Sequence, residues 1–93
     1  MDPDKINKLR QTIDEIDNAL LDSLQARFHL MPSILAYKQA VGLAIEDPVR
    51  EEKILQKVGE KAAQVGIDPR AVQKIFRIII DESKRIQEGL QKK

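Results

Sequence analysis

Two cations, Arg27 and Lys38, interrupt an otherwise apolar helical pattern in the first forty residues. They are eleven residues apart, so on a continuous helix of about 100° per residue their side chains project within about 20° of each other. Three turns apart on one face, they could bind one small anion together. Arg10 lies seventeen residues before Arg27 and points about 100° away. We therefore expect Arg10 to serve the site of a partner chain.

Further polar groups gather at two other places in the sequence. Ser83 and Gln87 are four residues apart and share one face of a helix. Asp47, Arg50 and Glu51 lie within one turn at the start of another helix. Taken singly, such groups are more often solvated surface groups or surface ion pairs than parts of a site. Asp47 has a structural role in any case, because aspartate is a preferred N-cap.

Composition excludes several classes of function. The 93 residues carry 16 basic and 15 acidic side chains, so there is no general attraction to nucleic acid or to anionic membranes. The chain has no cysteine, and its one histidine, His29, cannot form a zinc site without several carboxylates. We therefore expect no metal and no cofactor. The charged N-terminus lacks the apolar segment of a secretory signal, which predicts a cytoplasmic protein.

The periodicity predicts an all-α domain over 1–93, with helices over about 3–41, about 48–65 and about 69–89. An Asp-Pro pair stands at each predicted start, where aspartate caps the helix and proline fits the first turn. Gly42 and Gly66 follow the first two helices and predict their ends. The pattern contains no strand signal.

Pro32 lies inside the first predicted helix, between Arg27 and Lys38. A proline within a helix removes one backbone hydrogen bond and clashes with the carbonyl four residues earlier. The chain could turn here and form two helices, but the flanking residues are apolar and keep the helical register. We therefore expect a kink and not a break.

The length of this first helix predicts a dimer. At about 1.5 Å per residue it is roughly 55–60 Å long, whereas a compact monomer of this size has a radius of gyration of about 12 Å. One chain cannot cover the apolar face along such a length. A second copy of the chain is the simplest partner.

These residues, in this order, resemble the all-helical class of chorismate mutases over about residues 6–90. The fragments that carry the resemblance are Leu9-Arg10-x-x-Ile13-Asp14-x-Ile16-Asp17, Arg27, Tyr37-Lys38, Asp47-Pro48-x-Arg50-Glu51 and Ile80-x-x-Ser83-x-x-x-Gln87. The resemblance implies an intertwined homodimer of three-helix chains that forms a six-helix bundle, with sites shared between the chains. It also implies the conversion of chorismate to prephenate, a one-substrate pericyclic step that needs no nucleophile, metal or redox cofactor.

The resemblance assigns roles to the polar residues. Lys38 and Gln87 are the catalytic donors to the ether oxygen that gains charge in the transition state. The other residues bind the dicarboxylate substrate. Arg27 of one chain and Arg10 of the other hold carboxylates with help from Ser83, Glu51 accepts from the ring hydroxyl beside the backbone of Asp47, and Arg50 completes the positive lining.

Two alternatives remain open at the level of sequence. An isochorismate-pyruvate lyase shares the fold and the cationic lining, but it lacks the acidic pair present here as Asp47 and Glu51. A non-catalytic helical dimerisation module would also explain the long amphipathic helix. Such a scaffold has no reason to bury Lys38 and Gln87, because burial of unpaired polar groups costs free energy.

Overall fold

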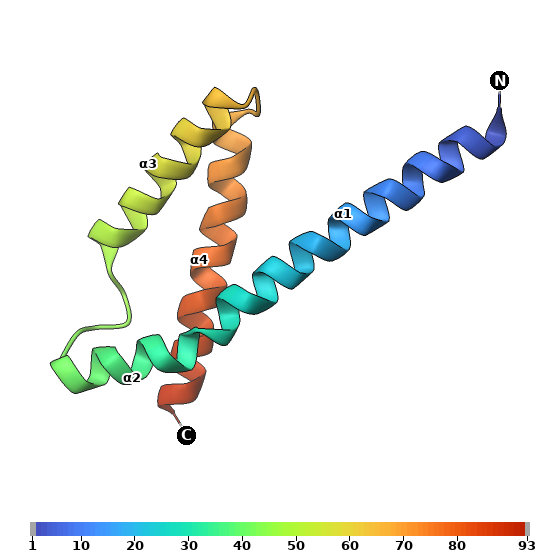
Figure 1. Ribbon diagram of the computed structural model, residues 1–93. Helices are drawn as coiled ribbons and strands as arrows, with labels where there is room; N and C mark the ends of the chain where they lie inside the picture. Colours follow the sequence, from blue (N-terminus) through green and yellow to red (C-terminus); the bar gives the residue numbers. More distant parts are fainter. Residues whose placement is uncertain (1, 93) are drawn as a thin grey trace. The chain divides into compact units, whose positions relative to one another are not determined.

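The computed structural model describes residues 2–92, and within this range every regular element is a helix. The prediction of an all-α fold is therefore confirmed for the described residues. The chain divides into two compact units, one ending at Leu30 and one starting at Met31. The helices, labelled in Figure 1, are α1 (Pro3–His29), α2 (Met31–Val41), α3 (Pro48–Gln64) and α4 (Pro69–Gln91).

The first unit consists of the single helix α1, none of whose residues is buried. Its N-cap is Asp2, whose side chain accepts a hydrogen bond from the backbone N–H of Asp4 at 2.9 Å. The apolar stripe expected from the sequence is exposed, with exposed fractions that rise from 47% at Ile6 to 59% at Leu20. This unit is therefore an amphipathic helix whose apolar residues are about half exposed.

The helix expected over about 3–41 is interrupted at one residue, Leu30. The backbone N–H of Leu30 donates to the carbonyl of Arg27 at 3.2 Å, three residues back, which tightens the last turn of α1. Pro32 is then the second residue of α2, a first-turn position where a missing N–H leaves no hydrogen bond unmade. The helix expected over about 3–41 is thus divided into α1 and α2 by Leu30 alone, whose φ of −79° and ψ of −14° remain in the αR region. The angle calculated between Arg27 and Lys38 assumed a continuous helix and does not apply.

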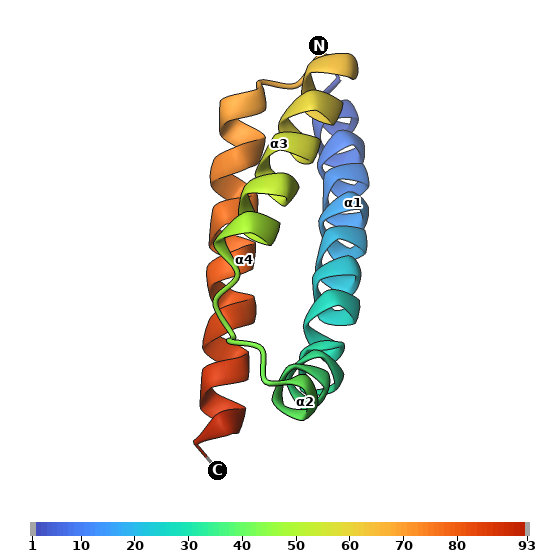
Figure 2. The same cartoon turned by 90° about the vertical axis from the view of Figure 1, so that its left-hand side faces the viewer.

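The second unit is a packed arrangement of α2, α3 and α4. Helix α3 runs antiparallel along α4, joined to it by a short turn, as both views show (Figures 1 and 2), and α2 packs on α4. Gly59 is buried on α3 where the amide of Gln73 approaches, and a Cβ there would lie 2.6 Å from Nε2 of Gln73. This close approach lets Gln73 donate to the backbone carbonyl of Leu55 at 3.0 Å and ties α4 to α3. The buried apolar residues are Met31, Leu35, Ala62 and Ile80.

The ends of the helices follow local chemistry. Asp47 and Asp68 cap α3 and α4 by accepting from backbone N–H groups two or three residues ahead. Gly42 and Gly66 adopt φ values of 74° and 78°, in the left-handed region that favours glycine. In both cases the residue after the glycine donates its N–H back to a carbonyl five residues earlier, at 2.8 Å. Helices α2 and α3 therefore end just before Gly42 and Gly66, as predicted from the positions of these glycines in the sequence.

Candidate active site

Ser83 and Gln87 lie one turn apart on the buried face of α4, as their spacing predicts. Gln87 is 3% exposed, and its Nε2 donates to the backbone carbonyl of Ser83 at 3.3 Å. The same nitrogen lies 3.5 Å from Sδ of Met31 on α2, a contact that spans 56 residues of sequence. Ser83 itself donates its hydroxyl to the carbonyl of Ile79 at 2.9 Å.

The amide of Gln87 has hydrogen-bonding capacity left for a ligand. A thioether sulfur is a weak acceptor, so the hydrogen that faces Met31 is held loosely and can be redirected to an oxygen. The amide oxygen Oε1 is buried and has no hydrogen-bond partner among the described residues. Leaving such a group unpaired costs about 1–3 kcal/mol. This unmet demand makes Gln87 a candidate for binding a polar molecule.

Lys38 is half-buried in the last turn of α2. Its Nζ donates to the backbone carbonyl of Ile45 at 2.8 Å, in the segment that leads to α3. An ammonium group has three hydrogens, so two donors remain for other acceptors. The contact with Ile45 limits the rotation of the side chain and restricts the directions that these donors can take.

Glu51 is the centre of a charged cluster between α3 and α4. Its Oε1 accepts hydrogen bonds from the guanidinium of Arg77 at 2.9 Å and from Nζ of Lys84 at 3.1 Å. Its Oε2 accepts a hydrogen bond from the backbone N–H of Asp47 at 3.2 Å. The contact with Asp47 reaches back to the residue that caps the same helix, in the manner of a capping box. Only 11% of the Glu51 side chain is exposed. The structure therefore holds both oxygens of this carboxylate in defined positions.

The charges of the cluster keep Glu51 ionised. Burial raises the pKa of Glu51, but the hydrogen bonds from Arg77, Lys84 and the Asp47 backbone outweigh it, so that the pKa lies below its ordinary value. The hydrogen bond to Glu51 in turn raises the pKa of Lys84, against a smaller opposite effect of burial. Glu51 is thus an acceptor for a neutral donor such as a hydroxyl.

The second unit brings several of the predicted site residues together, and it adds two that the sequence analysis did not identify. Arg77 and Lys84 are half-buried and seven residues apart on α4, with Asp81 between them paired to both at 3.7 Å. The alternation of positive and negative side chains on this face of α4 is the sequence feature that could have identified Arg77 and Lys84. Asp47 and Arg50 lie in the first turn of α3, where the N–H of Arg50 donates to Asp47 and its side chain is exposed.

Arg10 and Arg27 belong to the first unit. Arg10 is exposed on α1, and Arg27 is half-buried in its last turn. Their separation along this uninterrupted helix is about 25 Å, so the two side chains of one chain cannot contact the same small molecule. Their roles in binding carboxylates stay predictions.

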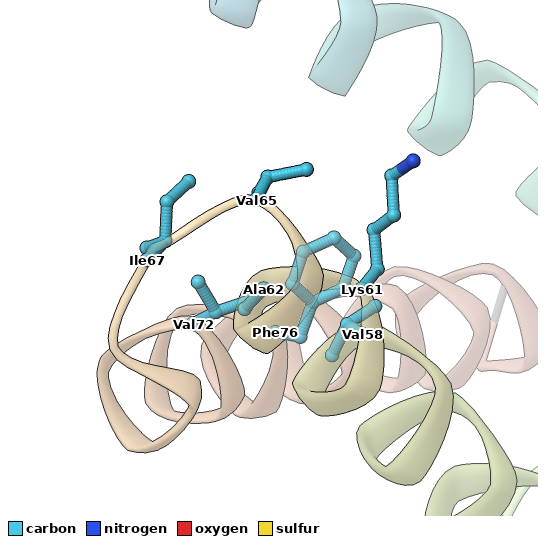
Figure 3. A pocket seen from close by; sticks show the side chains of 7 residues that line it. All are labelled: Val58, Lys61, Ala62, Val65, Ile67, Val72 and Phe76. Atoms are coloured by element: carbon cyan, nitrogen blue, oxygen red, sulfur yellow. The ribbon is translucent and has the colours of Figure 1, made fainter.

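An open pocket lies at the other end of the α3–α4 pair, near the turn that joins the two helices (Figure 3). Its walls are almost entirely apolar, and its one cation, Lys61, extends away from the apolar side chains. A dicarboxylate would find no second positive group in it. The pocket contains none of the predicted site residues, and is lined by Val58, Lys61, Ala62, Val65, Ile67, Val72 and Phe76. It is therefore not the candidate active site.

None of the helices within residues 2–92 combines the length and the apolar character needed to cross a lipid bilayer.

Comparison with known proteins gives consistent matches over most of the chain. The family described as chorismate mutase type II matches residues 9–88. A chorismate mutase of Methanocaldococcus jannaschii is 32% identical over 84 residues, which cover 90% of this chain and 85% of that protein. The T-protein of Enterobacter agglomerans is 33% identical over 85% of this chain, but the match spans only 21% of that longer protein. A 4-amino-4-deoxychorismate mutase of Streptomyces venezuelae is 27% identical, over 90% of this chain and 82% of that protein.

Both the family match and the relative from Methanocaldococcus jannaschii extend over most of the sequence. The chain therefore belongs to the type II chorismate mutase family, and chorismate mutase, an isomerase, is the enzyme activity that this membership assigns to it.

Proposed function

We propose that this protein converts chorismate to prephenate in the biosynthesis of phenylalanine and tyrosine, using residues of two chains. The reaction breaks the ether bond of chorismate and forms a carbon–carbon bond within the same molecule. No proton, metal or redox partner has to enter. The protein must instead hold the folded substrate and stabilise the negative charge that grows on the ether oxygen.

The observation that carries this proposal is the buried amide of Gln87. A scaffold helix gains nothing from an amide whose oxygen is unpaired and whose nitrogen faces a sulfur. An enzyme gains a donor already in a low-dielectric environment, where a hydrogen bond to a developing charge is strongest. Lys38 supplies the second donor, with its ammonium directed by Ile45.

The substrate's other groups find complementary partners in the proposed site. Glu51, kept ionised by its two cations, accepts the ring hydroxyl near the backbone of Asp47. Arg27 and Arg50 supply positive charge for the substrate carboxylates, and Ser83 donates a hydrogen bond to one of them. Arg10 comes from the second chain, because it lies about 25 Å from Arg27 along α1.

The exposed apolar side of α1 supports a homodimer. Ile6, Leu9, Ile13, Ile16 and Leu20 all lie on this side and are about half exposed in the single chain. Each fully buried side chain of this kind contributes about 1.5–3 kcal/mol, so pairing with a second copy is strongly favoured. We propose that two chains intertwine through α1 into a bundle. Sedimentation equilibrium at micromolar concentration tests the dimer, and fractionation of cells tests the expected cytoplasmic location.

The decisive test of the activity is product identification with two substrates. Purified protein is incubated with chorismate and, separately, with isochorismate. Prephenate from chorismate is the expected result, whereas pyruvate and salicylate from isochorismate would identify the lyase alternative. No reaction with either compound would favour the non-catalytic dimerisation module.

A further inference from the structure

The carboxylate of Glu51 has little unused hydrogen-bonding capacity. A carboxylate oxygen has about two acceptor positions, and Oε1 uses both, one for Arg77 and one for Lys84. Oε2 uses one for the backbone N–H of Asp47. One acceptor position on Oε2 therefore remains. It matches a substrate group that donates a single hydrogen bond.

The charge of Glu51 is also compensated from inside the protein. Two full positive charges lie within 3.1 Å of one oxygen of this largely buried carboxylate. The outer partners of these cations are Asp81 and Glu46, at 3.4–3.7 Å. The side chains of these two acids are 56% and 70% exposed, so water screens them more than it screens Glu51. A third cation placed against Glu51 would gain little attraction and would meet two like charges.

From this arrangement we infer that Arg77 and Lys84 determine substrate specificity, by making Glu51 accept a neutral hydroxyl on the substrate ring and reject an ammonium group at the same position. The inference rests on the proposed function, in which Glu51 faces the ring hydroxyl of chorismate. Two kinds of relative are named for substrates that differ at this ring position: one for chorismate, which carries a hydroxyl, and one for 4-amino-4-deoxychorismate, which carries an amine.

The chemistry of the two substituents explains the discrimination. A hydroxyl is uncharged and satisfies the one free position on Oε2. A protonated amine carries a full charge and three hydrogens, and it needs a carboxylate that is not already neutralised. Like charges brought together in a partly buried site cost free energy, and buried donors left unpaired add to that cost. Arg77 and Lys84 act through Glu51 and are positioning residues.

The test compares the two substrates in the 93-residue chain and in single variants of it. The ratio of kcat/KM for chorismate to kcat/KM for 4-amino-4-deoxychorismate is measured for the wild type, Lys84→Gln and Arg77→Gln. We expect the wild type to prefer chorismate, and each variant to reduce this preference by about tenfold, a scale typical of discrimination by a single contact. Lys84→Arg, which keeps the charge, should retain the wild-type ratio.

Arg85→Gln is the matched control. It removes one positive charge from the next position on α4, but Arg85 is an exposed residue that pairs with Glu82 outside the cluster. Its ratio should equal that of the wild type. General damage to the fold would lower both activities together and leave the ratio unchanged, so the ratio separates specificity from stability. Circular dichroism confirms that each variant is folded, and Arg77→Gln provides the test if Lys84→Gln does not fold.

The possible outcomes separate this inference from the proposed function. If the wild type makes no prephenate, the proposed function itself fails. If it makes prephenate but the ratio is the same in Lys84→Gln and Arg77→Gln as in the wild type, only the specificity inference is overturned. A wild-type preference for the amino compound would also overturn it, while the mutase chemistry would stand.

Discussion

Gln87, Lys38 and Glu51 are each held by a contact that constrains the side chain without using all of its hydrogen-bonding groups. Gln87 donates to a backbone carbonyl and to a weak sulfur acceptor, and Lys38 donates to one backbone carbonyl. Glu51 keeps one acceptor position after three contacts. In the proposed site each side chain is thus already oriented, which would avoid the cost of ordering it during the reaction.

Lys38→Ala should lower kcat by at least about 10²–10³, the usual loss when one preorganised donor to a developing oxyanion is removed. Nζ of Lys38 donates to the backbone carbonyl of Ile45, which limits the directions that its other two donors can take. Steady-state assay of prephenate formation measures the effect. Lys53→Ala, on the exposed side of α3, is the control and should keep full activity. A folded Lys38→Ala enzyme that loses less than threefold would exclude Lys38 as a catalytic donor.

Gln87→Glu should give an enzyme that works only at acid pH. A protonated carboxyl can donate to the ether oxygen, whereas a carboxylate would repel the charge that grows there. The position is buried and lies beside the carbonyl of Ser83, which favours the protonated form. The measurement is kcat between pH 5 and pH 8 for both proteins. Equal activity of the variant at the two ends of this range would show that Gln87 is not a donor.

Glu51 should make the stability of the protein fall in acid. Its pKa is lower in the folded chain than the ordinary value of 4.5, so the folded state releases the proton more readily than the unfolded state does. The resulting stabilisation is complete above pH 4.5 and is lost as the pH falls through the folded value. Urea unfolding from pH 6 to pH 3 should show this loss, and Glu51→Gln should show a smaller one. A larger loss of stability between pH 6 and pH 3 in Glu51→Gln than in the wild type would contradict the lowered pKa of Glu51.

At the scale of elements, the two caps of the second unit allow a matched comparison. Asp68 caps α4 at the α3–α4 turn, and Asp47 caps α3 beside Glu51. Asp68→Ala should cost about 1 kcal/mol of stability, as for other N-caps, and leave kcat unchanged. Asp47→Ala should cost a similar amount and also lower kcat/KM, because loss of the cap loosens the first turn of α3, where the backbone N–H of residue 47 holds Glu51. Thermal unfolding measures the loss of stability, and steady-state kinetics measures kcat/KM. If Asp68→Ala lowered kcat/KM as much as Asp47→Ala does, the loss in Asp47→Ala would not be a local effect on Glu51.

At the scale of the whole molecule, the exposed apolar side of α1 and the position of Arg10 lead to one proposal, a dimer with shared sites. Arg10 and Arg27 lie on the same uninterrupted helix, so their separation of about 25 Å does not depend on how the rest of the chain is arranged. If Arg10 binds substrate at all, it must do so beside the Arg27 of another chain.

Complementation between two inactive variants tests this proposal. Arg10→Ala and Lys38→Ala are unfolded, mixed in equal amounts and refolded together. Random pairing gives about half mixed dimers, and each mixed dimer has one site with both changes and one intact site. Activity should therefore return to about a quarter of the wild-type value. If mass spectrometry confirms mixed dimers and no activity returns, the site is not shared in this way and Arg10 is a surface residue.

The sequence by itself determined the helical class, the places where helices begin and end, and the pairing of Ser83 with Gln87 on one face. These features depend on neighbours within four or five residues, through caps, prolines and glycines, and local chemistry is readable from sequence. The residue at which the long helix is interrupted, Leu30, was not predicted, because the sequence around Pro32 keeps the helical register on both sides.

Only the tertiary structure decided what surrounds the site residues. Arg77 and Lys84 reach Glu51 across 26 and 33 residues of sequence, and Gln87 reaches Met31 across 56. Such contacts require α4 to pack on α3 and α2 in one register, which is the summed result of many apolar contacts and of close approaches such as that at Gly59. The spacing of charges along one helix does not show which of them will meet a carboxylate on the next.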